Sequence, residues 1–214
     1  MDTDTNTEVL LLDVGGVIVP PADPDALARA ARLLGLSSIE VGALLYEWEP
    51  WYALSTGRLE EDAYWRALGD RVGWDAEDLR RLVAPVWEPN RVDEGVMDLA
   101  RALHGRMRLA ILSNATIRLE DHLRRLDVAP YFDPIINSAR IGLRKPDPRI
   151  FVYTLDALAV APAAILFVDD KRRNTAVAEQ LGIPSVLFDR AATLAGALAS
   201  RGLLPPGGHD LTHP

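Results

Sequence analysis

The chain has 214 residues, enough for one domain of ordinary size or for a core domain with a modest insertion. Hydrophobic residues make up 49% and charged residues 25%, close to the globular average, so a buried core is available. The formal net charge of −8 argues against nucleic acid as a partner, because phosphate backbones are bound by clustered basic surfaces. A small phosphorylated metabolite, which needs only a few local cations, remains compatible. The lack of cysteine excludes disulfides, thiolate metal sites and cysteine-based catalysis.

The sequence shows no sign of membrane association. No apolar run reaches the roughly 18–20 residues that a transmembrane helix needs, so we expect no membrane partner. The first residues, MDTDTNTE, are acidic and polar, whereas a signal peptide has a basic start and an apolar middle. We therefore expect a cytoplasmic protein. Residues 205–214 are rich in proline and glycine and are expected to form a flexible C-terminal tail.

Short apolar runs bounded by polar or turn-forming residues predict buried strands. There are five of them: Val9–Leu12, Leu109–Leu112, Pro134–Ile136, Ile165–Val168 and Ser185–Phe188. Helical patterns separate the later runs, at Ile117–Leu126, Asp147–Leu158 and Arg172–Leu181. Strands that alternate with helices at this spacing indicate right-handed βαβ units. The predicted fold is therefore α/β, a Rossmann-like, doubly wound parallel sheet covered on both faces.

The long stretch between the first two strands has no convincing strand. It holds several amphipathic helical segments, among them Pro24–Leu34, Ser38–Trp48, Leu59–Leu68 and Ala76–Val86. We expect a small α-helical cap domain at residues 21–92, inserted into an α/β core formed by residues 1–20 and 93–204. The alternative is that these helices pack on the sheet as ordinary crossover elements.

Polar residues follow four of the predicted elements at the point where a ligand would bind. In an open parallel sheet, ligands lie outside the carboxyl ends of the strands, so residues far apart in sequence can share one site. Each cluster alone is explained equally well by a helix cap or a turn, and the combination carries the inference. The candidate residues are Asp13, Gly15, Gly16, Ser113, Asn114, Lys145, Asp169 and Asp170.

The segments LLLDVGGVIV, LAILSNAT, GLRKPDPRIF and ILFVDDKRRN resemble the four motifs of haloacid dehalogenase-like hydrolases, in the correct order. The resemblance spans residues 8 to 190, and the helical insertion matches the cap that this superfamily carries after its first motif. The stretch TGRLEEDAYWRAL also resembles the cap sequence of the small sugar-phosphate phosphatases of the superfamily.

The resemblance implies a Mg²⁺-dependent phosphatase. Asp13 would attack phosphorus and form an aspartyl-phosphate, which splits one difficult displacement into two easier ones. Mg²⁺, which prefers oxygen ligands, would be held by Asp13, the carbonyl of Gly15 and Asp169, with Asp170 as an outer or alternative ligand. Lys145 would neutralise both the nucleophile and the phosphate.

The remaining site residues would bind the phosphate itself. The resemblance implies that Ser113 and Asn114 donate hydrogen bonds to phosphoryl oxygens. Backbone N–H groups around Gly15 and Gly16 would complete an anion-binding nest. Glycine also allows close approach of the backbone to a ligand.

One position departs from the family pattern. The usual phosphatase motif has a second aspartate two residues after the nucleophile, which protonates the leaving group and then activates water, but here that residue is Gly15. General acid–base catalysis is typically worth about 10²–10⁴ in rate. The protein would then hydrolyse slowly, use another acid, or favour acyl, anomeric or aryl phosphates, whose leaving groups need little help. Candidate substitute acids are Asp23, Asp25, Glu47 and Glu49.

The missing acid leaves two other functions open. One is a catalytically weak or inactive module that binds a phosphorylated metabolite or another protein. The other is a haloacid dehalogenase, since halide leaves without a proton, although the resemblance implies no magnesium in that branch. Substrate choice would depend on cap residues, which could instead form the core of the cap: Trp48, Trp51, Tyr52, Arg58 and Tyr64.

Overall fold

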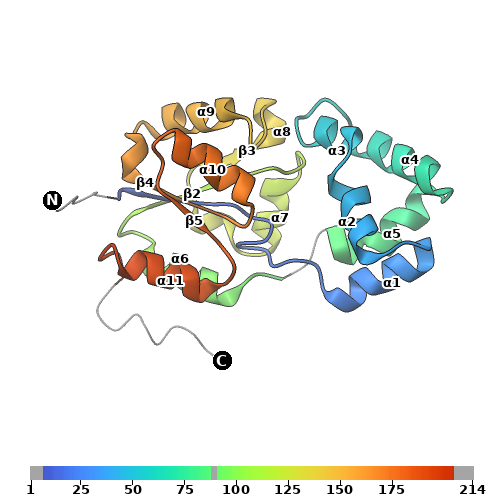
Figure 1. Ribbon diagram of the computed structural model, residues 1–214, viewed down its shortest axis with the longest axis horizontal. Coiled ribbons are helices and arrows are strands. Elements are labelled where there is room, and N and C mark those ends of the chain that lie inside the picture. Colours follow the sequence, from blue (N-terminus) through green and yellow to red (C-terminus); the bar gives the residue numbers. More distant parts are fainter. Residues whose placement is uncertain (1–6, 88–90, 205–214) are drawn as a thin grey trace.

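The computed structural model describes residues 7–87 and 91–204 of the chain, so the expected tail at 205–214 lies outside the described residues. Its centre is one parallel sheet with the strand order β3-β2-β1-β4-β5 (Figure 1). The strands are β1 (Val9–Leu12), β2 (Arg108–Ser113), β3 (Ile135–Asn137), β4 (Ile165–Asp169) and β5 (Ser185–Leu187). The predicted α/β fold is confirmed, and each strand lies within two residues of its expected bounds.

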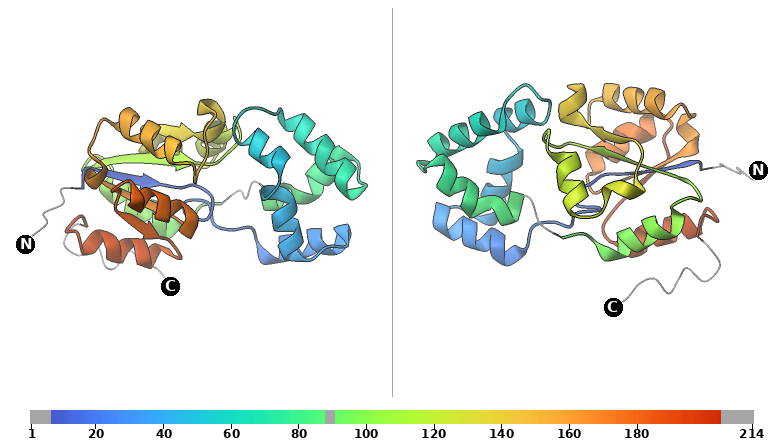
Figure 2. Two further views of the ribbon diagram at one scale, coloured as in Figure 1. Left: turned by 45° about the horizontal axis from the view of Figure 1, so that its top comes forward. Right: turned by 180° about the vertical axis from the view of Figure 1, so that it is seen from behind.

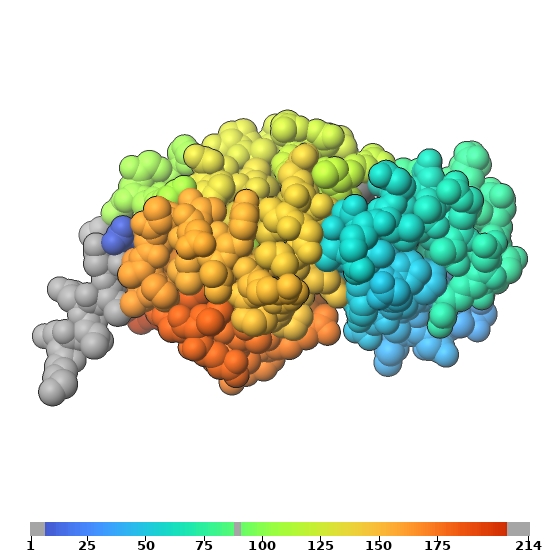
Figure 3. Space-filling model, turned by 90° about the horizontal axis from the view of Figure 1, so that it is seen from above, coloured from blue at the N-terminus to red at the C-terminus, as the bar shows by residue number. Residues whose placement is uncertain are grey.

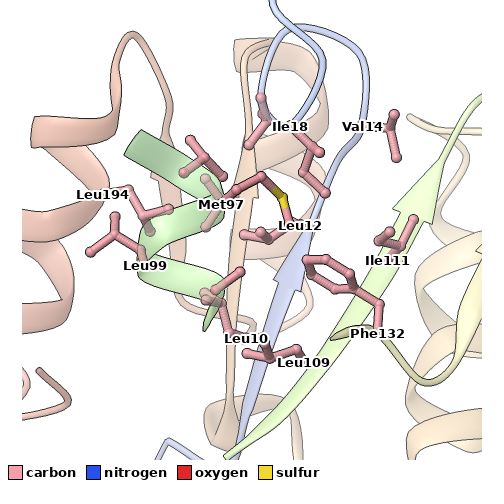
Figure 4. Packing of buried hydrophobic residues seen from close by; sticks show 14 of the residues in the cluster. Leu10, Leu12, Val14, Ile18, Met97, Leu99, Leu109, Ile111, Phe132 and Leu194 are labelled. Atoms are coloured by element: carbon pink, nitrogen blue, oxygen red, sulfur yellow. The ribbon is translucent and has the colours of Figure 1, made fainter. Parts of the chain in front are cut away.

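Helices cover both faces of this sheet (Figure 1). On one face Leu10 and Leu12 of β1 join the apolar cluster of α6 (Glu94–Leu103), α7 (Leu119–Arg125) and α11 (Ala191–Ala199). Figure 4 shows Leu12 beside Met97, and Leu10 further along the strand near Leu109. On the other face Val9 and Leu11 pack with α9 (Pro148–Leu158) and α10 (Arg172–Gln180). Because both faces are buried, the strand is a continuous apolar run.

The three helices predicted after the second strand are present as α7, α9 and α10, with shorter ends. At α9 the reason is visible: Asp147 is the N-cap, and its side chain accepts a hydrogen bond from the Arg149 N–H, so the helix begins at Pro148. Three helices were not expected from the sequence, namely α6, α11 and the single turn α8 (Ser138–Ile141). Two 3₁₀ turns complete the core, at Ala129–Tyr131 and Pro162–Ala164.

Five further helices form a separate helical unit beside the sheet (Figures 1 and 2). They are α1 (Pro24–Leu34), α2 (Ser38–Tyr46), α3 (Glu49–Leu54), α4 (Glu61–Val72) and α5 (Ala76–Trp87). These helices pack around an apolar cluster of their own, which includes Trp51, Tyr64 and Leu68. The cap boundaries expected at residues 21 and 92 stay a prediction.

Local signals explain where the first helices of this unit begin. The Asp23 carboxylate caps α1 by accepting hydrogen bonds from two backbone N–H groups, and Pro24 occupies the first helical position. Gly35, with a φ of 67°, ends the helix in the left-handed conformation that glycine adopts at low cost. Ser37 and Glu40 form a reciprocal capping box at the start of α2.

The helical unit rests on the carboxyl edge of the sheet. Its two connections to the core run side by side, because the Asp93 N–H donates to the Ile18 carbonyl at 2.8 Å and Arg91 donates to the Pro21 carbonyl at 2.8 Å. Near the end of β3 the Ser138 hydroxyl donates to the backbone carbonyl of Ser55, the residue after α3, at 2.6 Å. Figure 3 shows this cyan part of the helical unit against the yellow part of the core. Within the described ranges, no helix has the length and apolar character to cross a membrane.

Candidate active site

The strand order brings the candidate residues together. Strand β1 lies between β2 and β4, and the order of the strands reverses there. Asp13 directly follows β1, Ser113 is the last residue of β2, and Asp169 is the last residue of β4. Since the strands are parallel, these side chains lie at the same edge of the sheet, at the switch point where open α/β sheets bind ligands.

A buried lysine connects the ends of the three strands. The Lys145 ammonium donates to Asp169 Oδ2 at 2.7 Å and to the Leu112 carbonyl at 2.7 Å, and it lies 3.0 Å from Asp13 Oδ2. Its side chain is fully buried, so the charge depends on these partners. Three acceptors match the three N–H donors of an ammonium group. The sequence had indicated a role for Lys145 beside Asp13, and the structure places the two in contact.

Asn114 fixes the backbone that carries this lysine. Its side-chain amide donates to the Lys145 carbonyl at 2.8 Å and accepts from the Lys145 N–H at 2.8 Å. The pair of bonds ties the loop after α8 to the end of β2. This geometry makes Asn114 a positioning residue for Lys145, whereas the phosphate contact expected of its side chain stays a prediction.

The two neighbouring aspartates at the end of β4 differ in their surroundings. Asp169 accepts hydrogen bonds from the Lys171 N–H, from Asn174 and from Lys145, so protein donors satisfy both of its oxygens. Asp170 Oδ1 is buried and has no hydrogen-bond partner in the part of the chain that the structure describes. Carboxylate oxygens of Asp13, Asp169 and Asp170 lie within 4.8 Å of one another. An unpartnered oxygen in such a cluster fits a divalent cation, and it favours Asp170 over Asp169 as the direct ligand.

Burial dominates the electrostatics of this cluster. It raises the pKa of the Asp13 carboxyl to about 7, with Lys145 opposing the rise and the Asp169 charge adding to it. Burial also raises the pKa of Asp170. For Asp169 the effect of burial is outweighed by Lys145 and the other donors, which lower its pKa. The two carboxylates likewise outweigh burial at Lys145 and raise its pKa. One ammonium therefore does not balance the acidic cluster, and a cation would favour the ionised form of Asp13.

A cavity of about 380 Å³ opens between this edge of the sheet and the helical unit. Six of the predicted site residues line it: Asp13, Gly15, Gly16, Ser113, Asn114 and Asp170. Lys145 and Asp169 are both buried and do not line the cavity. Lys145 contacts Asp13, and Asp169 contacts Lys145. Asp13 thus lines the cavity and also contacts the ammonium of Lys145.

Gly15 and Gly16 differ in whether the structure leaves room for a side chain. Gly16 has a φ of +83°, and a Cβ there would lie 2.5 Å from Asp170 Oδ2, so a side chain would displace the Asp170 carboxylate. A Cβ on Gly15 would meet no atom within 4 Å. The place where a phosphatase of this type has its acid is therefore open space, not space taken by another residue.

Most of the candidate acids and of the expected pocket residues do not line the cavity. Of the four candidate acids, Glu47 lines the cavity, while Asp23 caps α1. Of the five candidate pocket residues, Trp51 lines the cavity, whereas Tyr64 is buried inside the helical unit and donates to the Leu45 carbonyl. Residues that sequence reasoning did not place at the cavity include Tyr46, Trp87, His122, Arg144 and Arg173.

Basic side chains form part of the cavity wall. Arg144, Lys171 and Arg173 line it, and within residues 7–87 and 91–204 none of them lies within 4.0 Å of a carboxylate oxygen. Arg144 stacks on the ring of Tyr52 at 4.2 Å and leaves its buried Nε without a hydrogen-bond partner. These charges favour an anionic ligand.

Comparison with known proteins identifies the family. The family model described as "Hydrolase: haloacid dehalogenase-like hydrolase" matches residues 7–182. The chain therefore belongs to the haloacid dehalogenase-like hydrolases, which confirms the family indicated by the four motifs.

Several relatives cover most of the chain. Drimenol cyclase drtB of Aspergillus calidoustus is 30% identical over 206 residues, which are 91% of this chain but 38% of that protein, so the chain spans well under half of its length. Sesquiterpene phosphatase astK of Aspergillus oryzae is 26% identical over 195 residues, covering 88% of this chain and 94% of that protein. A family enzyme of Bacteroides thetaiotaomicron, solved in complex with magnesium and inorganic phosphate, shares the fold with a TM-score of 0.68 at 20% identity, covering 86% of this chain and 94% of that one.

The pKa of Asp13 predicts how stability depends on pH. The folded protein retains a proton on Asp13 up to about pH 7, while the unfolded chain loses it near 3.8, so stability should fall as the pH rises between these values. The variant Asp13→Asn has no ionisable carboxyl group at this position, so its stability should not fall in this way. In metal-free buffer at pH 8 it should melt several degrees above the unmodified protein, and the difference should shrink as the pH falls toward 4. Thermal melts with chelator test this, and a difference that does not vary with pH would contradict it.

Proposed function

We propose that the protein is a Mg²⁺-dependent phosphatase that hydrolyses a small phosphorylated molecule through an aspartyl-phosphate on Asp13. The observation that carries the proposal is the geometry around this carboxylate, which faces a cavity while Lys145 lies 3.0 Å behind it. The unpartnered Asp170 oxygen beside it supports the metal. A relative named as a phosphatase and a solved relative with magnesium and phosphate support the reaction class.

The metal would be held by Asp13, Asp170 and the carbonyl of Gly15, and it would supply positive charge to the incoming phosphate and the nucleophile. Asp169 then has a different role from the one expected from the sequence: it holds the Lys145 ammonium against Asp13. This assignment follows from the hydrogen bonds that already occupy Asp169.

The chain's own residues perform the displacement. A carboxylate oxygen of Asp13 forms a bond to phosphorus while the bond from phosphorus to the leaving oxygen breaks. Lys145 neutralises charge at Asp13, and Ser113 with the backbone N–H group of Gly15 binds the phosphoryl oxygens. The Gly16 N–H, expected from the sequence to bind phosphate as well, already donates to the Val19 carbonyl at 2.8 Å. Water then attacks phosphorus, a proton passes to solvent, and phosphate leaves with Asp13 regenerated. Catalysis is therefore mostly positioning and electrostatic stabilisation.

The leaving oxygen receives no proton from residue 15, which is glycine beside open space. Substrates whose leaving groups are stable as anions, such as acyl, anomeric and aryl phosphates, should be favoured over simple alkyl phosphates. Glu47 is the candidate acid that lines the cavity. The other three candidates are not among the residues that line it.

The proposal includes the helical unit as a cap at residues 21–92 on a core of residues 1–20 and 93–204. It is supported by the separate apolar cluster of α1–α5 and by the contact between Ser138 and Ser55 over the edge of the sheet. A cap in this position excludes water from the reaction. A cytoplasmic location belongs to the same proposal and agrees with a chain that has no cysteine to form disulfides.

Phosphate release from a panel of acyl, aryl and alkyl phosphates, with and without Mg²⁺, tests the function. We expect Mg²⁺-dependent release that is lost in Asp13→Asn, because this variant has no nucleophile. Tight binding of phosphate without turnover would instead identify a binding module, and metal-independent release of chloride from 2-chloropropionate would identify a dehalogenase.

Restoring the absent acid tests the account of Gly15. A Cβ at this position would meet no atom within 4 Å, so Gly15→Asp should raise kcat for an alkyl phosphate by tenfold or more, toward the range of about 10²–10⁴ for general acid catalysis. Aryl phosphates should gain less because their leaving groups need less protonation. Gly15→Asn is the matched control, equal in size but unable to donate an acidic proton, and an equal gain in this variant would refute the explanation.

A further inference from the structure

The cavity has two chemically different walls. The wall from the core carries most of the charged lining residues, among them Asp13, Asp170, Arg144, Lys171 and Arg173. The opposite wall comes from the helical unit and the connection leading to it, and it is almost entirely apolar. Its apolar lining residues include Leu27, Tyr46, Trp51, Val86 and Trp87, and Gly42 and Glu47 also line it.

The aromatic part of the apolar wall is preformed. The rings of Tyr46 and Trp87 are stacked with centroids 5.4 Å apart, and Trp51 meets them edge-on at 5.3 Å and 5.2 Å. The Tyr46 hydroxyl donates to the Val86 carbonyl, so it is already engaged within the helical unit. Rings locked by such contacts present apolar area to a ligand without a further loss of side-chain freedom.

This wall suits a hydrocarbon better than a sugar. Glu47 is the one charged side chain that the helical unit contributes to the cavity within the described residues. Sugar hydroxyls buried here would lose their hydrogen bonds to water with few partners in return. A hydrocarbon would lose nothing on leaving water and would gain from burial against the rings. The stretch TGRLEEDAYWRAL, residues 56–68, which resembles sugar-phosphate phosphatases, contributes no residue to the cavity lining.

We infer that the organic part of the substrate is a hydrocarbon, with the phosphate at Asp13 and the apolar tail against Tyr46, Trp51 and Trp87. The leaving-group preference set by Gly15 still applies, so simple alkyl esters of this class should bind but turn over slowly. This inference rests on the proposed phosphatase function. The cavity has a volume of about 380 Å³, so the gain from a longer tail should end once the apolar wall is covered.

A series of n-alkyl phosphates from two to ten carbons tests the tail site. The leaving alcohols of this series have nearly the same acidity, so chain length changes binding and leaves the chemical step alone. KM should fall about three- to fourfold for each added CH₂, the equivalent of about 0.8 kcal/mol, and level off within the series once the apolar wall is covered. The Kd for the same esters, measured by calorimetry on Asp13→Asn with Mg²⁺, should follow the same course. A polyol phosphate of similar length should bind at least a hundredfold more weakly than the heptyl ester.

Gly42 offers a variant that fills the tail site. It lies within α2 and lines the cavity, and a Cβ there would meet no atom within 4 Å, so Gly42→Leu adds a side chain at the cavity wall. The dependence of KM on chain length should then end at two or three carbons. Gly196→Leu is the matched control, since Gly196 is an exposed helical glycine of α11 with equal space and no part in the cavity. Gly196→Leu should show the same dependence of KM on chain length as the unmodified protein.

The outcomes separate this inference from the function on which it rests. Hydrolysis of acetyl phosphate with Mg²⁺, combined with KM and Kd values that do not change with alkyl chain length, would overturn the hydrocarbon site and leave the phosphatase intact. Polyol phosphates bound as tightly as the heptyl ester would do the same. Absence of hydrolysis of acetyl phosphate and aryl phosphates would overturn the phosphatase and the inference together.

Discussion

The active site depends on one buried ammonium group. Lys145 has no contact with water, and an isolated charge in that position would be strongly destabilising, so its acceptors have to be supplied by the fold. The ends of three adjacent strands supply them: Asp13 after β1, the Leu112 carbonyl in β2 and Asp169 in β4. Asn114 holds the loop that delivers the lysine. The parallel sheet therefore stabilises the buried lysine, because it brings the acceptors at three strand ends together.

The same arrangement explains why the site needs further positive charge. Three carboxylates lie close together with one buried ammonium in contact with two of them, burial raises the pKa of Asp13 to about 7, and Asp170 keeps an unpartnered oxygen. A divalent cation relieves this imbalance and leaves Asp13 ionised as a nucleophile. On the far side of the cavity the helical unit offers aromatic rings in place of charge. The two walls together define a ligand with an anionic head and an apolar tail.

The sequence predicts the core well because buried parallel strands are continuous apolar runs that end in polar residues. Asp13, Ser113 and Asp169 follow or end such runs, so their meeting at one edge could be predicted. The roles of Asp169 and Asp170 could not, because adjacent residues differ here only in which donors surround them. Short helices such as α8 were missed since they depend on tertiary contacts, in this case between Ser138 and Ser55.

The aromatic wall of the cavity could not be predicted from the sequence either. Trp51 was expected either at the pocket or in the core of the helical unit, and it takes both positions, buried among rings while it lines the cavity. Tyr46 and Trp87 are 41 residues apart in the sequence, and only the packing of α2 against the end of α5 shows that their rings stack. Helical periodicity identifies which residues are apolar but not which of them remain accessible to a ligand.

The most direct test of this account is to look for the covalent intermediate. The protein would be mixed with an acyl or aryl phosphate and Mg²⁺, quenched in acid, and mapped by peptide mass spectrometry. The account predicts a phosphoryl group on Asp13, absent without Mg²⁺ and strongly reduced when Lys145→Met removes the ammonium. Phosphate release with no label on Asp13, or a label on another residue, would contradict the role assigned to the buried Lys145–Asp13 pair.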